Sequence, residues 1–362
     1  MRKKSNNRHI GRFEKLEDRN MMAVNVQDFS NSVSIYGDQG DDEIQIYSIG
    51  TRLIRVQGLN GTQVDGGTHV DVPLSFYDDL RISMGDGQNR VWIAGQGGRS
   101  VWANNVSIWG GSDDDIVEVE QLFTQDDLSI ITWSGNDTVR IVDSVFGDRT
   151  FGTGTEDLDI QTWAGHNVVY LGNVTSTRGM SIESSFGDSS RISLQQVDAK
   201  FGSLSVSGTD GDDSLSAFDV RAGESIHIDL GDGDDYAGLY RMDAHRTLSI
   251  DTGDGNDQLS LMASEAQRLL INMGSDSDRA ELHDVHVWDS MNISMGDGDD
   301  RLSIYSSTGG RAAVHGGEGS DFLEAHDNVF ANFAHDGFET AFDLALPKKA
   351  TLTGTLKSEL TL

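Results

Sequence analysis

An aspartate closes a glycine-rich turn six times in the C-terminal half of this 362-residue chain. Successive aspartates are 21 or 22 residues apart, and they are Asp213, Asp235, Asp257, Asp278, Asp300 and Asp321. Carboxylates in such a pattern favour the binding of a hard cation, and the chain has no cysteine that would attract a transition metal. Ca²⁺ is therefore the expected ligand of these turns. The alternative is structural: each aspartate hydrogen-bonds the backbone of its own turn as an Asx-turn.

The residues around each turn predict the elements that position it. With Asp257 as position zero, apolar residues lie at −9, −7, +2 and +4, as Leu248, Ile250, Leu259 and Leu261. Alternation with a period of two is typical of a half-buried strand, and a glycine- and aspartate-rich segment is typical of a turn. The unit is therefore a strand, a tight turn and a second strand.

The same register occurs twelve times along the chain, although the first strand of the Ser190 unit is shifted by one residue. In chain order its zero positions are Asp42, Asn89, Asp115, Asp137, Asn167, Ser190, Asp213, Asp235, Asp257, Asp278, Asp300 and Asp321. Self-similarity at a period above 20 residues indicates a solenoid. We predict an all-β, right-handed parallel β-helix (β-solenoid) of about 22 residues per coil, with a weaker third face after the second strand, as at 218–220 and 285–287.

Stacking has an electrostatic consequence for the aspartates. Carboxylates on neighbouring coils would lie roughly 5 Å apart, the spacing of paired strands. At an effective dielectric constant of 20, each neighbouring pair repels by roughly 3 kcal/mol. Such a row needs a counter-ion, protonation or an outward splay of the side chains.

One turn carries a known repeat motif. Residues 316–324, Gly-Gly-Glu-Gly-Ser-Asp-Phe-Leu-Glu, match the nonapeptide Gly-Gly-x-Gly-x-Asp-x-U-x, where U is apolar, and 231–235, 253–257 and 296–300 match all but its first glycine. The motif resembles the calcium-binding repeats of RTX toxins (hemolysin-type repeats) and related secreted proteins. The resemblance implies Ca²⁺ between successive turns, held by turn carbonyls and by Asp213, Asp235, Asp257, Asp278, Asp300 and Asp321. The family repeats the motif every nine residues, whereas here it occurs once per coil, so at most one row of calcium is expected.

Composition limits the classes of partner. The formal net charge of −32 opposes binding to nucleic acid or anionic lipid, because both require Lys and Arg. No run of 18 apolar residues is present, so no membrane span is expected. The expected partners are calcium and a cell-surface polysaccharide or other matrix proteins.

The N-terminal residues 1–23 differ from the rest of the chain. Seven of the first twenty residues are Lys or Arg, and no apolar stretch of a secretory signal follows. Residues 12–23, Arg-Phe-Glu-Lys-Leu-Glu-Asp-Arg-Asn-Met-Met-Ala, resemble the N-terminal Leu-Glu-x-Arg-x-Leu-Leu-Ala-like motif of planctomycete extracellular proteins, with two methionines in place of leucines. The resemblance implies an extracellular or cell-surface location. The alternative is a disordered basic tail.

The repeat also sets the expected organisation. We expect an export or sorting segment at 1–23, irregular first coils and an N-terminal cap at 24–79, about eleven regular coils at 80–326, and a C-terminal cap at 327–362. The aromatic residues of the last segment would cover the final coil. A partner-binding tail is the alternative for that segment.

Nothing in the sequence favours catalysis. No catalytic signature is present, and no metal motif includes the histidines of the last coils, which are His283, His286, His315, His326 and His335.

The early coils contain five tryptophans, Trp92, Trp102, Trp109, Trp133 and Trp163. They favour an aromatic ladder, with a sugar-binding platform as the alternative. We therefore expect a non-catalytic, structural or adhesive solenoid. A carbohydrate-active β-helix enzyme, such as a polysaccharide lyase or hydrolase, is the competing class, and a cleft where two carboxylates face an arginine would favour it.

Overall fold

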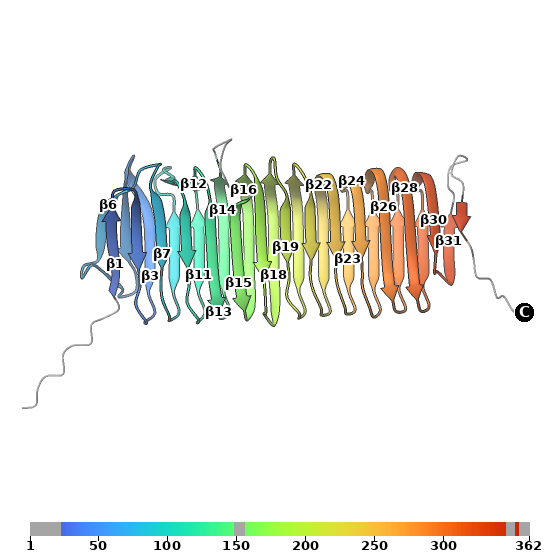
Figure 1. Ribbon diagram of the computed structural model, residues 1–362, viewed down its shortest axis with the longest axis horizontal. Helices are drawn as coiled ribbons and strands as arrows, with labels where there is room; N and C mark the ends of the chain where they lie inside the picture. The colour runs from blue at the N-terminus through green and yellow to red at the C-terminus, as the bar shows by residue number, and fades with distance from the viewer. Residues whose placement is uncertain (1–22, 148–155, 345–351, 355–362) are drawn as a thin grey trace, which may run out of the picture.

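A computed structural model describes residues 23–147, 156–344 and 352–354, and these residues contain strands and turns but no helix. They form an all-β solenoid of about twelve turns, with about 22 residues in each parallel coil. The coils follow one another in chain order along the long axis, from the blue N-terminal end to the red C-terminal end (Figure 1). The predicted fold class is confirmed. The export motif at 12–23 lies outside the described residues, apart from Ala23.

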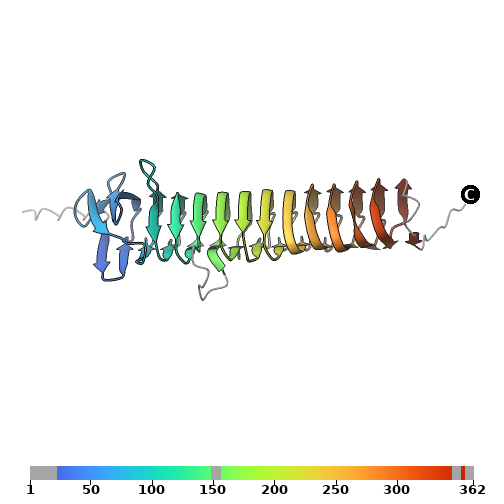
Figure 2. The same ribbon diagram turned by 90° about the horizontal axis from the view of Figure 1, so that it is seen from above.

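The first row of parallel strands comes before the glycine-rich turns. It is formed in order by β2 (Ser32–Tyr36), β7 (Asp79–Ser83), β10 (Val106–Trp109), β13 (Leu128–Ser134), β15 (Glu156–Ala164), β17 (Gly179–Ser184), β19 (Leu204–Ser207), β21 (Ile226–Asp229), the second half of β22 (Tyr236–Asp251), β24 (Glu265–Asn272), β26 (His286–Asp297), β28 (Thr308–Glu318), β30 (Val329–Asp336) and β32 (Leu352–Gly354). Seen from above, the coils repeat at an even spacing (Figure 2).

The second row follows the turns. It contains β3 (Glu43–Gly50), β8 (Arg90–Ala94), β11 (Ile116–Glu120), β14 (Thr138–Phe146), β16 (His166–Ser176), β18 (Ser189–Ala199), β20 (Ser214–Ala222), the first half of β22, β23 (Gln258–Met262), β25 (Arg279–His283), β27 (Arg301–Tyr305), β29 (Phe322–His326) and β31 (Thr340–Leu344).

A third, shorter row makes the coil three-sided, as the sequence predicts. It begins with β9 (Val101–Ala103) and β12 (Leu122–Thr124), and longer strands continue it after a sharp bend. In β20 the bend is at Asp219, whose φ is 57°, and Val220 beyond it pairs with Val197 and Met242 of the two adjacent coils.

Antiparallel hairpins cover the N-terminal end of the solenoid. Strand β1 (Ala23–Phe29) pairs with β2, β4 (Leu53–Gly58) pairs with β3, and β6 (His69–Pro73) pairs with β4. The short β5 (Gln63–Val64) lies parallel to β1. These hairpins pair with the open side of β2 and β3, which would otherwise be an aggregation-prone edge.

The predicted register describes the core correctly. Leu248, Ile250, Leu259 and Leu261, the four apolar residues around Asp257, are all buried. Equivalent positions stack directly: Leu259 pairs with Ala237 in one neighbouring coil and with Ala280 in the other. At the C-terminal end, Phe330, Phe333 and Phe338 are buried, whereas Phe342 is exposed. The solenoid thus encloses one continuous apolar core that positions the turns along one edge.

Candidate cation-binding turns

The aspartates predicted from the sequence lie in one buried row. Each follows a strand of the first row and precedes a strand of the second, so stacking superimposes them in register. Asp257, for example, lies between β22 and β23 and is 1% exposed. The side chains of Asp213, Asp235, Asp257, Asp278, Asp300 and Asp321 are all buried.

One oxygen of each carboxylate connects two coils. The backbone N–H of Asp235 donates to Oδ1 of Asp257 at 2.8 Å, and the N–H of Asp257 donates to Oδ1 of Asp278 at 2.9 Å. The same bond continues from Asp278 to Asp300 and from Asp300 to Asp321. The Oδ1 atoms therefore form a ladder that satisfies buried backbone donors along the solenoid.

This acceptor role accounts for two of the three residues that replace aspartate upstream, Asn89 and Asn167, but not for Ser190, whose Oγ is buried without a hydrogen-bond partner. Oδ1 of Asn89 accepts from the N–H of Asp42, and Oδ1 of Asn167 accepts from the N–H of Asp137, both at 3.0 Å. Asparagine serves this purpose as well as aspartate does, because only a carbonyl-type oxygen is required. The sequence showed the Asp/Asn alternation, but without the structure it could not be assigned to a donor one coil away.

The second carboxylate oxygen divides the turns into two kinds. In closed turns, Oδ2 accepts the backbone N–H of the residue four positions earlier. This bond joins Asp42 to Asp38 at 3.0 Å, Asp115 to Gly111 at 2.6 Å and Asp213 to Thr209 at 2.5 Å. Asp213, one of the six predicted ligands, thus has both oxygens occupied.

In open turns, Oδ2 is buried and has no hydrogen-bond partner. Five consecutive turns are of this kind, and their aspartates are Asp235, Asp257, Asp278, Asp300 and Asp321. Each has a glycine with positive φ four residues before the aspartate and a second residue with positive φ two residues before it, such as Gly253 and Gly255. Asp137 also has an unpartnered Oδ2, but Trp133 replaces the first glycine of its turn.

Asn89 shows what surrounds the second oxygen of an open turn. Its turn has the same positive φ at Gly85 and Gly87. The side-chain amide nitrogen of Asn89 donates to the carbonyl oxygen of Gly85 at 3.1 Å and to that of Gly87 at 2.8 Å. We infer that Oδ2 of an aspartate in the same conformation faces carbonyl oxygens. An ionised carboxylate that faces carbonyl oxygens requires a proton or a cation. At Asp257 the hydroxyl of Thr252 also favours the charged form.

The glycines are needed for coil stacking as well. A Cβ on Gly253 would lie 1.7 Å from the carbonyl oxygen of Gly231, and one on Gly274 would lie 1.6 Å from that of Gly253. The carbonyl of one coil therefore occupies the space where the next glycine would carry a side chain. The glycine row both brings coils together and aligns carbonyl oxygens along the edge.

Burial shifts the ionisation of the row. It raises the pKa of Asp235 and of Asp278 to about 8, and that of Asp257 to about 6. Removal of the carboxyl from water is the main cause, and the charges of neighbouring aspartates add to it, while the N–H from the preceding coil acts in the opposite direction. The carboxyls of the open turns are therefore costly to ionise unless a cation is present.

The donor set fits a hard cation that carbonyl oxygens can hold. Among the described residues, no group of three or more His, Cys, Asp or Glu side chains could hold a metal by itself. One carboxylate oxygen together with turn carbonyls is an all-oxygen set, which suits Ca²⁺, a cation that accepts carbonyl ligands in flexible geometry. In such a set, the unpartnered Oδ2 atoms would be the anionic ligands.

The histidines of the last coils do not come together as a metal site. His283 contacts Asp284, His326 contacts Glu324, and His315 contacts Asp336, each as a separate pair on the surface. Part of the predicted aromatic ladder is present in the middle coils. The ring centroids of Trp133 and Trp163 are 5.0 Å apart, and Phe186 continues the row, whereas Trp102 stacks on Phe123.

A cluster of arginine and aspartates was missed in the sequence. Arg178 pairs with Asp126, Asp127 and Asp157, of which Asp157 is fully buried. The partners of Arg178 lie 21 to 52 residues away in the chain, so only the coil stacking brings them together. Burial raises the pKa of Asp127 to about 6.

A scan against models of protein families finds no match to this chain, and searches of curated proteins and of solved structures find none either. The described residues contain no helix long and apolar enough to span a membrane.

Proposed function

We propose that this protein is an exported, non-catalytic β-solenoid of the cell surface or extracellular matrix, in which a row of calcium ions stabilises the turns. The role is structural or adhesive. The proposed ligands are Asp235, Asp257, Asp278, Asp300 and Asp321 with the carbonyl oxygens of their turns. Asp213 supports the row as a hydrogen-bond acceptor, because both of its oxygens are occupied.

One observation carries the calcium proposal. Five consecutive buried carboxylates leave one oxygen without a donor, in a turn conformation where Asn89 donates its amide to carbonyl oxygens. A buried polar atom without a partner costs about 1–3 kcal/mol, and more if it is charged. Divalent cations bound in these turns would give each of the five unpartnered Oδ2 atoms a ligand bond.

Thermal melting of the full chain tests the proposal. Calcium should raise the melting temperature, because the unfolded chain lacks the sites, by an amount that grows with its concentration. Magnesium at the same concentration should raise it much less, since Mg²⁺ needs near-ideal octahedral geometry and loses water reluctantly. Equal melting temperatures in calcium and in chelator would contradict calcium binding.

Export is proposed from the basic N-terminal segment and its resemblance to extracellular proteins. The net charge of −32 is consistent with a calcium-rich exterior and with a polysaccharide partner bridged by cations. Fractionation of the native organism tests it: the protein should be found outside the cell or on its surface, and recovery from the cytoplasm alone would refute export.

The competing function is a carbohydrate-active enzyme, and the Arg178 cluster is the observation that favours it. Three carboxylates surround one arginine, and carboxylates that face an arginine are the feature expected to favour this class. However, the guanidinium is bound by all three aspartates and Asp157 is fully buried, as in a structural ion-pair network. Cleavage of uronate polysaccharides, lost on Arg178→Lys in a folded protein, would establish the enzyme instead.

A further inference from the structure

A pocket of about 630 Å³ lies at the junction between the N-terminal hairpins and the first regular coils. Three segments distant in sequence form it: the end of β3 with the start of β4, the connection from β6 to β7, and the connection from β8 into β9. Its volume is in the range of small-molecule sites, about 300–1,000 Å³. Neither the turn aspartates nor the buried apolar positions of the repeat line it.

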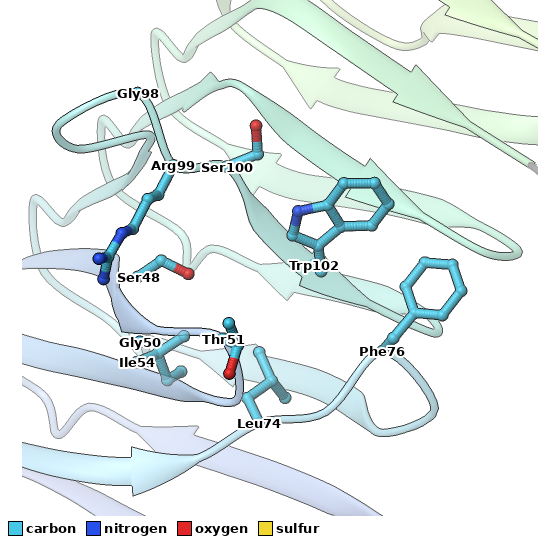
Figure 3. A pocket seen from close by; sticks show the side chains of 10 residues that line it. All are labelled: Ser48, Gly50, Thr51, Ile54, Leu74, Phe76, Gly98, Arg99, Ser100 and Trp102. Carbon is cyan, nitrogen blue, oxygen red and sulfur yellow. The ribbon is translucent and has the colours of Figure 1, made fainter.

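The pocket has an apolar floor and an aromatic wall. Ile54 and Leu74 are buried beneath it, and the rings of Phe76 and Trp102 contact each other edge to face, with centroids 5.3 Å apart. Phe123 of the next coil stacks on Trp102 at 4.6 Å, which holds the indole in place, yet Trp102 remains 43% exposed. In Figure 3, Trp102 lies between Phe76 and Arg99. Large exposed aromatic surface beside a pocket suits the apolar face of a sugar ring.

The polar side of the pocket is positive. Arg99 is the only charged residue among those that line it, in a chain with 59 acidic and 27 basic residues. Its Nη1 atom donates to the backbone oxygen of Ile49 at 3.1 Å, which fixes the guanidinium at the rim. Within the described residues, no carboxylate forms an ion pair with Arg99, whereas Arg90 and Arg178 are each paired. Its remaining N–H groups can bind an anion.

Hydroxyl groups complete the lining. Ser48, Thr51 and Ser100 all border the pocket. A hydroxyl both donates and accepts hydrogen bonds, so these side chains match the hydroxyl groups of a carbohydrate. An aromatic wall, three hydroxyls and one unpaired arginine describe a ligand with an apolar face, several hydroxyls and a carboxylate.

We propose that this pocket binds a uronate residue of an acidic polysaccharide, with the sugar ring against Trp102 and Phe76 and its carboxylate on Arg99. The site is separate from the turn aspartates and does not use calcium. It would attach one end of the solenoid to an acidic glycan. A test of uronate binding in this pocket is therefore independent of whether the turns bind calcium.

Titration by ligand-observed NMR tests the site with two probes that differ in one group. Methyl β-D-glucuronoside carries a carboxylate where methyl β-D-glucoside carries a hydroxymethyl group. The full chain in chelator should bind the glucuronoside at least about tenfold more tightly, because only its carboxylate can form a charge-assisted hydrogen bond with Arg99. Arg99→Gln should remove that preference and leave the weak binding of the glucoside unchanged.

Two tryptophan variants complete the test. Trp102→Ala should abolish binding of both probes, and the matched variant Trp133→Ala, in the exposed ladder away from the pocket, should bind as the parent does. Equal affinity for the two probes, no binding of the glucuronoside up to about 20 mM, or an unchanged preference in Arg99→Gln would overturn the proposal. Arg99 is on the surface, so the Arg99→Gln result stands even if Trp102→Ala does not fold.

Discussion

The two oxygens of each turn aspartate have different partners. Oδ1 accepts an N–H from the adjacent coil in the open turn of Asp257 and in the closed turns of Asp115 and Asp213, so it holds these coils together whether or not a cation is bound. In the closed turn of Asp42, at the N-terminal end, Oδ1 has no hydrogen-bond partner. Oδ2 accepts the turn's own N–H at Asp115 but has no donor at Asp257. The structural and the cation-binding explanations of the aspartates therefore apply to different atoms of the same side chain.

Matched asparagine substitutions separate the two kinds of turn. Asp257→Asn should raise the melting temperature of the calcium-free protein at pH 8 by a few degrees, about 1 kcal/mol, because the new amide donates to turn carbonyls as Asn89 does. The same variant should respond less to calcium, since an anionic ligand is lost. Thermal melting in chelator and in calcium measures both effects.

The control is the same substitution in a closed turn. In the parent, Oδ2 of Asp115 accepts the N–H of Gly111 at 2.6 Å. Asp115→Asn places an amide donor against that N–H and should destabilise the protein by about 1–3 kcal/mol. Its calcium response should equal that of the parent. Destabilisation of both variants by similar amounts would mean that the two kinds of turn do not differ as described.

The raised pKa values predict how pH affects the calcium-free protein. Asp235 and Asp278 have a pKa of about 8 in the folded chain, against 3.8 for an ordinary aspartate, so the native state binds their protons more tightly than the unfolded state does. Their contribution to stability is complete below about pH 4 and is lost as pH rises through about 8. Urea unfolding in chelator should therefore show a falling free energy of unfolding across that interval.

Calcium should change the sign of this dependence, because it binds the ionised carboxyl and competes with the proton. In excess calcium, the open turns should be more stable at pH 8 than at pH 5. A calcium-free protein whose stability is constant from pH 4 to 8, measured at constant ionic strength, would show that these carboxyls are not desolvated as the structure indicates.

Individual strands are specified by local sequence pattern. Leu259 and Leu261 were expected inside from the period of two, and both are buried. The same argument identified the third face, although the bend at Asp219 requires a positive φ that the sequence alone did not indicate. Pattern fixes which way a residue faces, whereas the bend depends on the geometry of the stacked coils.

A pair of leucine substitutions tests the register of the strands. Leu259→Asp should be severely destabilising, because it buries a charge with no partner. Leu270→Asp, on the outward face of β24 and 38% exposed, should change the melting temperature little. If the two variants melt alike, the inward register of the second row is wrong.

Long-range features could not be predicted from the sequence, for a physical reason. The pairing of Arg178 with Asp126 spans 52 residues, and the pocket combines side chains from residue 48 to residue 102. Both depend on coils of unequal length and on connections that do not repeat, so no period reveals them. The distinction between open and closed turns was likewise only partly visible, since Gly111 is a glycine at the first turn position but lacks the positive φ of Gly253.

At the scale of the whole molecule, the five open turns are consecutive and occupy the C-terminal part of the solenoid, from Asp235 to Asp321. The aromatic ladder and the pocket lie in its N-terminal and middle coils. The proposed cation sites and the proposed glycan site therefore lie in different parts of the solenoid. Each bound ion would order a turn that contacts the next coil, so the row should fill cooperatively.

Counting the bound ions tests the central claim most directly. Equilibrium dialysis of the full chain against calcium should give up to five ions per chain, and a variant with asparagine at Asp235, Asp257, Asp278, Asp300 and Asp321 should bind none while remaining folded. The asparagine variant keeps the Oδ1 ladder, so loss of binding cannot be attributed to loss of the fold. No bound calcium in the parent, or the same number of ions in the variant, would contradict the account.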